Sequence, residues 1–199
     1  MGIETKKDKT LLFILREFNL DQTITNLSKE MNISRVGMWK IIKKLQEEEL
    51  IIIKSIGKGK TSTHLIKLNW DNLLLEKSLT LIIAQESNKE KRWSWEFNQL
   101  KKHVDFTILY GSILHSPEKA NDIDIINVVS KKSEFVKIDK LIMEKQAAQS
   151  KKIHDINFTP KEFKTELKKQ NKAFLHAIKT GIILYNQENF VTFMKEILT

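Results

Sequence analysis

Cysteine is absent from the 199-residue chain, and proline and glycine are scarce, with two and six residues. The lack of cysteine excludes a disulfide framework, a cysteine-ligated zinc site and a thiol nucleophile. Pure apolar runs are short, and those at 11–15 and 50–53 fall far below the ~18 residues that span a bilayer. The first residues, MGIETKKDK, are polar. We therefore expect no signal peptide, no membrane partner and a cytoplasmic location.

Acidic residues are outnumbered by basic ones, 25 to 34, which gives a formal net charge of +9 and a pI of about 9.5. Residues 1–70 carry the largest excess, with 13 basic and 8 acidic side chains. A basic surface favours polyanions, because each phosphate contact releases counterions. Hydrophobic residues make up 41% of the chain, which is enough for a packed core. The composition indicates a folded protein. Lysine-rich surfaces are also common in proteins from AT-rich genomes, so the basic N-terminal third points to nucleic acid only if a motif accompanies it.

The N-terminal third has the order helix, helix, turn, helix, hairpin. Apolar residues recur at helical spacing over 11–18, 24–31 and 38–45. Asp21 or Thr23 can cap the second helix, and Ser34 can cap the third. A β-branched run at 50–56, a Gly-Lys-Gly-Lys turn and an alternating stretch at 63–68 then predict a two-stranded hairpin.

The stretch TITNLSKEMNISRVGMWKIIKKLQEEELI resembles the helix–turn–helix of bacterial and archaeal winged-helix regulators. The resemblance implies that the third helix enters the major groove of double-stranded DNA and that the hairpin tip touches its backbone or minor groove. The DNA-binding residues expected from it are Ser34, Arg35, Trp39, Lys40, Lys43, Lys58 and Lys60. Arg35 suits a guanine edge, whereas Lys40 and Lys43 suit phosphates. Trp39 either stacks on DNA or packs on a neighbouring domain, and winged helices also serve as protein-binding modules.

Residues 71–103 contain no proline or glycine and predict two helices. We expect Asp71 to cap the first helix, over 71–88. The second, over 89–103, carries Trp93, Phe97 and Leu100 in one stripe. We interpret this segment as a helical connector and the stripe as core or as a homodimer interface.

A glycine–serine pair and two aspartates mark the C-terminal half. A buried strand is predicted over 106–110; Gly111 and Ser112 break it, and after nine residues Asp122 and Asp124 open a second strand. Period two places both carboxylates on one side of that strand, where they repel unless a cation such as Mg²⁺ or Mn²⁺ lies between them. Gly111 lets the backbone approach phosphate oxygens, and Ser112 adds a hydroxyl and an N–H at a helix start.

This Gly-Ser, nine-residue gap and Asp-x-Asp pattern resembles the minimal nucleotidyltransferases of the DNA polymerase β superfamily, over residues 104–199. The resemblance implies transfer of a nucleoside monophosphate from a nucleoside triphosphate, with ATP the expected donor, to a hydroxyl of a protein or nucleic acid. It also implies that Asp122, Asp124 and a third acid, for which Asp155 is the candidate, are catalytic and hold Mg²⁺ or Mn²⁺. Gly111 and Ser112 would then bind the phosphates. Because such domains often act in toxin–antitoxin pairs, a partner protein is one expected acceptor.

The chain departs from these relatives at His115 and Ser116, where they often have arginine and glycine. We interpret His154 as structural, because it should point to the opposite face of the strand from Asp155. The predicted architecture is α+β, with three parts: a winged helix-turn-helix domain at 1–70, a helical connector at 71–103, and a small nucleotidyltransferase-like α/β domain with a mixed sheet at 104–199. The alternative is a transcription regulator whose second domain is inactive and serves in nucleotide sensing or dimerisation.

Overall fold

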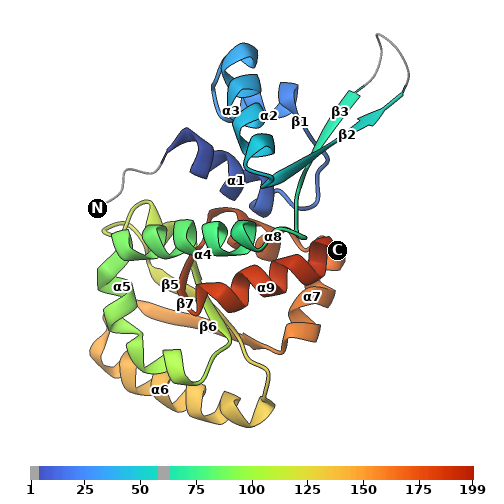
Figure 1. Cartoon of the computed structure of the whole chain (residues 1–199). Helices are drawn as coiled ribbons and strands as arrows, with labels where there is room; N and C mark the ends of the chain where they lie inside the picture. Colours follow the sequence, from blue (N-terminus) through green and yellow to red (C-terminus); the bar gives the residue numbers. More distant parts are fainter. Residues whose placement is uncertain (1–4, 58–62) are drawn as a thin grey trace. The chain divides into compact units, whose positions relative to one another are not determined.

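The computed structural model describes residues 5–57 and 63–199, which build a mixed α+β protein of two compact units (Figure 1). One unit extends to Ile82 and includes Leu198; the other comprises Ile83–Ile197 and Thr199. The boundary lies within helix α4 (Leu73–Ser87), so the predicted connector is divided between the units. No helix among the described residues has the length and apolar character needed to cross a membrane.

The N-terminal unit has the elements that the sequence predicts, with one short strand in addition. In chain order they are α1 (Lys6–Arg16), β1 (Gln22–Thr23), α2 (Ile24–Glu30), α3 (Arg35–Glu47), β2 (Ile51–Ile56) and β3 (Thr63–Leu68). The strands form an antiparallel sheet in the order β1-β3-β2. Two of the residues expected at the hairpin tip, Lys58 and Lys60, lie outside the described residues.

Side-chain caps fix where the helices of this unit begin. Thr23 Oγ1 accepts the backbone N–H of Asn26 at 3.1 Å, and Ser34 Oγ accepts that of Gly37 at 3.1 Å. Each bond satisfies an N–H that has no partner within its helix. Thr23 is therefore the cap of α2, not Asp21, and the prediction for Ser34 is confirmed. The apolar sides of the three helices and the sheet bury a common core.

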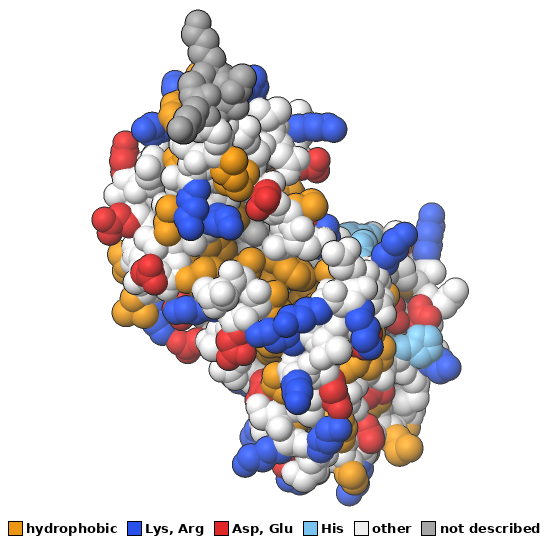
Figure 2. Space-filling model, turned by 90° about the vertical axis from the view of Figure 1, so that its right-hand side faces the viewer, with side chains coloured by type: hydrophobic (Ala, Val, Ile, Leu, Met, Phe, Trp, Pro, Cys, Tyr) orange, Lys and Arg blue, Asp and Glu red, His pale blue; other side chains and the backbone are white. Residues whose placement is uncertain are grey.

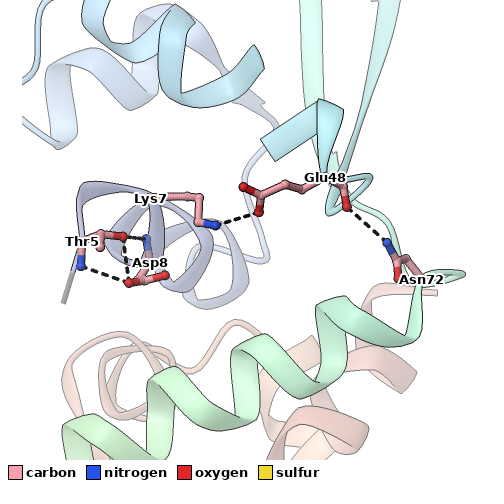
Figure 3. Close-up of polar contacts among 5 residues, drawn as sticks. All are labelled: Thr5, Lys7, Asp8, Glu48 and Asn72. Atoms are coloured by element: carbon pink, nitrogen blue, oxygen red, sulfur yellow. Dashed lines mark hydrogen bonds and ion pairs between the residues drawn. The ribbon is translucent and has the colours of Figure 1, made fainter. Parts of the chain in front are cut away.

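Polar contacts link the beginning and the end of the N-terminal unit to the residue that follows α3 (Figure 3). Lys7 Nζ lies 2.7 Å from Glu48 Oε2, and Asn72 Nδ2 donates to the Glu48 carbonyl at 3.4 Å. Asn72 Oδ1 also accepts the N–H of Leu74 at 2.9 Å, so Asn72 provides the cap that we expected from Asp71. The reason is position: α4 begins at Leu73, and Asp71 lies one residue too early.

The C-terminal unit is a four-stranded mixed sheet covered by helices. Its elements after α4 are η2 (Asn88–Glu90), α5 (Lys91–Glu96), η3 (Asn98–Lys102), β4 (Phe106–Tyr110), η4 (Ser112–Leu114), β5 (Asp122–Val128), η5 (Lys132–Glu134), α6 (Phe135–Ala148), β6 (Lys152–Phe158), α7 (Pro160–Lys168), α8 (Lys172–Thr180), β7 (Ile182–Tyr185) and α9 (Gln187–Leu198). The strand order is β6-β5-β4-β7, with β5 and β6 parallel and the other pairs antiparallel. The mixed sheet is as predicted, whereas the helix expected over 89–103 is broken into α5 and two 3₁₀ segments.

Successive residues of each strand point to opposite faces of the sheet, and each face packs against a different hydrophobic core. On one face, Ile123 and Ile125 join a cluster with Ile138 of α6 and with the predicted stripe of Trp93 and its neighbours. The stripe is therefore core. On the other face the Phe106 ring lies 5.4 Å from that of Phe190, in a group of phenylalanines contributed mainly by α7, α8 and α9. Burial of both faces makes the sheet a rigid platform for the ends of its strands.

Candidate functional site

The two aspartates of the Asp-x-Asp sequence lie at the start of β5 on one face of the sheet. Their neighbours across the sheet follow from the register: Asp124 pairs with Tyr110 of β4 on one side and with His154 of β6 on the other. Residues in register on adjacent strands share a face, as do residues two apart on one strand. The fold thus brings together Asp122, Asp124, Tyr110 and His154.

His154 lies close to both carboxylates. Its Nδ1 is 3.4 Å from Asp122 Oδ2 and 3.5 Å from Asp124 Oδ1. One ligand atom from each of the three residues falls within 4.8 Å of the others, the one such group of three found among the described residues. The side chains remain partly open to solvent, with 36%, 25% and 42% exposure for Asp122, Asp124 and His154. The group can therefore hold an ion and leave one side of it accessible.

The electrostatic environment of Asp124 favours a cation. Partial burial raises the pKa of the Asp124 carboxyl, the negative charge of Asp122 raises it further, and His154 opposes both effects. The pKa of the Tyr110 hydroxyl is also raised, first by burial and then by Asp124. Each raised pKa means that the negatively charged form of the side chain is destabilised at this place. Binding of a divalent cation removes that destabilisation, so the donor set fits a metal ion.

Gly111 is the residue that lets the Asp124 carboxylate approach the loop after β4. Its φ is +87°, a conformation that L side chains rarely adopt. A Cβ at this position would lie 2.5 Å from Asp124 Oδ2. Glycine is thus required for two reasons, the backbone conformation and the space that the Asp124 carboxylate occupies, and Gly111 itself is partly exposed.

Ser112 begins a short turn rather than a true helix. The Ser112 carbonyl accepts the backbone N–H groups of His115 and Ser116 at 3.1 and 2.9 Å, and buried Ile113 anchors the turn. Ser112 and His115 are exposed next to the candidate site in sequence. Because η4 has three residues, it supplies no helix dipole for phosphates. The helix start expected at Ser112 is therefore corrected to a 3₁₀ turn.

Asp155 lies on the opposite face of the sheet from Asp122 and Asp124. It is in register with Ile125, and its Oδ2 accepts Asn157 Nδ2 at 3.3 Å. Burial raises the pKa of the Asp155 carboxyl, and Asp139 of α6 raises it further. This placement disagrees with the prediction that Asp155 completes the metal site.

The residue beside the aspartate pair is instead His154, which we had interpreted as structural. The prediction that His154 and Asp155 face opposite ways is correct, but their faces are the reverse of those we expected. The signal that would have found His154 is the parallel pairing of β5 with β6 at a register of Asp124 to His154. That pairing joins segments thirty residues apart, and no local pattern specifies it.

The exposed side chains of α3 in the N-terminal unit include Arg35, Val36, Trp39, Lys40 and Lys43. Lys43 Nζ lies 5.1 Å from the centroid of the Trp39 ring, so the two form a cation–π pair one helical turn apart. Met38, Ile42 and Leu45 on the inner surface are fully buried. On the molecular face seen in Figure 2, Lys and Arg side chains are interspersed with acidic ones. Arg35, Lys40 and Lys43 make this surface of α3 basic.

Comparison of the chain with family models, with curated proteins and with solved structures found no match. The function is therefore inferred from the residues themselves. Two arrangements carry it: the acidic and imidazole group at the start of β5, beside Gly111, and the basic outer surface of α3.

Proposed function

We propose that the protein binds double-stranded DNA through its N-terminal unit and is a metal-dependent nucleotidyltransferase through its C-terminal unit. The donor is a nucleoside triphosphate, with ATP the expected one, and the acceptor is a hydroxyl of a protein or a nucleic acid. The N-terminal unit is then a winged helix-turn-helix and the C-terminal unit a minimal nucleotidyltransferase domain. A homodimer remains compatible with this proposal.

The observation that carries the enzymatic part is the contact of Asp124 with Gly111. A carboxylate pair on a strand is common, but here one carboxylate lies against a backbone segment that has no side chain and a positive φ. Such a segment admits phosphate oxygens close to the N–H groups of the loop. A dication held by Asp122 and Asp124 and a triphosphate along the loop would therefore be neighbours.

In the proposed reaction the acceptor oxygen attacks the α-phosphorus, and the bond from this phosphorus to the leaving pyrophosphate breaks. The acceptor proton passes to solvent. A bound dication would neutralise developing charge on the phosphates and lower the pKa of the acceptor hydroxyl. Asp122 and Asp124 would hold the dication, and the backbone around Gly111 and Ser112 would orient the triphosphate. The rigid sheet would keep these groups in position while the new bond forms and the bond to pyrophosphate breaks.

DNA binding is supported by the exposed face of α3. Arg35, at the start of the helix, would reach a guanine edge, and Lys40 and Lys43 would contact phosphates. The Ser34 hydroxyl already caps α3, so we propose that it orients the helix. The cation–π pair holds the Lys43 ammonium over Trp39, which favours a joint role of the two in DNA binding.

A transcription regulator with a nucleotide-sensing second unit is the second candidate. The observation that favours it is the placement of Asp155, which leaves the aspartate pair without a third carboxylate among the described residues. A site with two carboxylates and an imidazole can bind a metal–nucleotide complex without transferring the nucleoside monophosphate to an acceptor.

A transfer assay separates the two candidates. The full chain is mixed with each α-labelled nucleoside triphosphate, Mg²⁺ or Mn²⁺, and a lysate of the source cells. The test variant is Asp122→Asn/Asp124→Asn. The matched control is Asp139→Asn/Asp155→Asn, which removes one charge from α6 and one from the opposite face of the sheet.

The enzyme predicts label on a protein or nucleic acid that is lost in the test variant and kept in the control. Absence of label under every condition, together with metal-dependent nucleotide binding that needs Asp122 and Asp124, would establish the sensing regulator instead. Absence of both would refute the proposed site.

A further inference from the structure

The imidazole of His154 is held beside the aspartate pair by the sheet itself. The parallel register between β5 and β6 sets Asp124 directly across from His154, with Asp122 two residues earlier on the same face. The neighbouring pair in this ladder, Ile123 with Ile153, is apolar, and both side chains are buried. A shift of register by one residue would expose them, so the position of His154 is fixed by core packing.

The distances within the group match those between ligands of one ion. Bonds of about 2.1 Å from a central dication to N or O ligands place adjacent ligand atoms about 3.0–3.4 Å apart. His154 Nδ1 lies 3.4 and 3.5 Å from its two carboxylate neighbours. Ordinary N–H···O hydrogen bonds are shorter, at about 2.7–3.2 Å. The spacing of His154 from the two carboxylates is therefore close to that of ligands around a common centre.

The donor atoms also discriminate among metals. Mg²⁺ prefers oxygen ligands and near-ideal octahedral geometry, whereas first-row transition dications accept imidazole readily. Mn²⁺ shares with Mg²⁺ the preference for carboxylates and water, and as a first-row transition dication it accepts an imidazole more readily than Mg²⁺ does. We propose that His154 is the third protein ligand of this site and makes it selective for Mn²⁺ over Mg²⁺, by about tenfold or more. This inference rests on the metal site of the proposed function and adds its selectivity.

Metal binding to the nucleotide-free full chain tests the inference. Loss of the electron paramagnetic resonance signal of free Mn²⁺ gives the Mn²⁺ affinity, competition gives the Mg²⁺ affinity, and electron spin echo modulation reveals a ¹⁴N nucleus bound to Mn²⁺. The variants are His154→Ala and His154→Asp. The control is His176→Ala, an exposed histidine on α8. Thermal unfolding checks that each variant folds.

We expect the ¹⁴N modulation in the wild type and the His176→Ala control, and its loss in both His154 variants. His154→Ala should weaken Mn²⁺ binding by about tenfold or more, and His154→Asp should keep Mg²⁺ binding while lowering the Mn²⁺ preference. Absence of nitrogen modulation, or an equal preference for Mn²⁺ in wild type and His154→Ala, would overturn the inference.

The same experiment keeps this inference distinct from the proposed activity. Nitrogen-coordinated Mn²⁺ without any nucleotidyl transfer would refute the enzyme and leave the role of His154 intact. Transfer that depends on Asp122 and Asp124 but shows no nitrogen ligand would refute the role of His154 alone.

Discussion

Gly111 faces the carboxylate of Asp124, and a single added carbon on Gly111 would lie 2.5 Å from Asp124 Oδ2. The loop after β4 and the start of β5 are therefore fitted to each other at the one place where the candidate metal site and the candidate phosphate loop meet. Both residues had been singled out from the sequence, but their direct contact had not.

Gly111→Ala should destabilise the protein and disturb the metal site. The backbone conformation at Gly111 alone costs a residue with a β-carbon about 1–3 kcal/mol, and the contact with Asp124 adds to this cost. Urea unfolding of Gly111→Ala, Asp124→Ala and the double variant measures both parts. Because Asp124→Ala removes Oδ2, Gly111→Ala should cost less in that background. An equal cost in both backgrounds would show that the contact contributes nothing.

Lys40→Ala/Lys43→Ala should weaken binding to duplex DNA of any sequence. The logarithm of the binding constant falls linearly with the logarithm of the salt concentration. Each lost phosphate contact makes this fall less steep by about 0.9, so the pair should reduce the magnitude of the slope by about 2. Titrations at several salt concentrations measure this slope. The control, Lys140→Ala/Lys172→Ala, removes the same charge from exposed positions of the C-terminal unit. An equal effect of the two pairs would mean that net charge matters and α3 does not.

Asn127→Ala should cost about 2–4 kcal/mol of unfolding free energy, because it leaves two polar partners unsatisfied. Asn127 is fully buried; its Oδ1 accepts the Thr107 hydroxyl at 2.9 Å, and its Nδ2 donates to Asn157 Oδ1 at 3.0 Å. These bonds link β4, β5 and β6 across the sheet. Urea unfolding measures the loss, and the exposed Asn98→Ala should stay within about 0.5 kcal/mol of wild type. A similar small value for Asn127→Ala would refute the role of this chain of bonds.

Glu162 should make stability depend on pH in the acid range. Lys132, followed by the cap at Thr159, lowers the pKa of the Glu162 carboxyl from 4.5 to about 2. A carboxyl whose pKa is lower in the folded state stabilises the protein above its unfolded pKa, and this stabilisation is lost as the pH falls through the folded pKa. Wild type should therefore melt above Glu162→Gln at neutral pH.

The difference in melting temperature between wild type and Glu162→Gln should shrink as the pH falls from about 4.5 to about 2. Thermal unfolding from pH 2 to pH 7 measures it, and salt should reduce it, since both side chains of the Lys132–Glu162 pair are well exposed. A difference that is constant over this range would show that the ionised form has no advantage.

Local patterns in the sequence predicted most elements of this protein. The periodicity of apolar residues located α1, α2 and α3, because it is set by which side of a helix is buried, and a short apolar run located the strand at 106–110. The cap at Ser34 followed from its hydroxyl, and the side-by-side carboxylates of Asp122 and Asp124 from the period of a strand. All of these depend on residues that are close in the chain.

Non-local pairing was left to the tertiary structure. Whether His154 or Asp155 lies beside Asp124 depends on the register of β6 against β5, and both alternatives satisfy the same alternation. The buried pair of Ile123 and Ile153 in the parallel ladder favours this register, so core packing placed His154 at the site. The sequence by itself determined the aspartate pair and the glycine turn, because their geometry is local. Which residue lies beside the aspartate pair was decided only when the two strands paired, because strand pairing is governed by burial across the whole sheet.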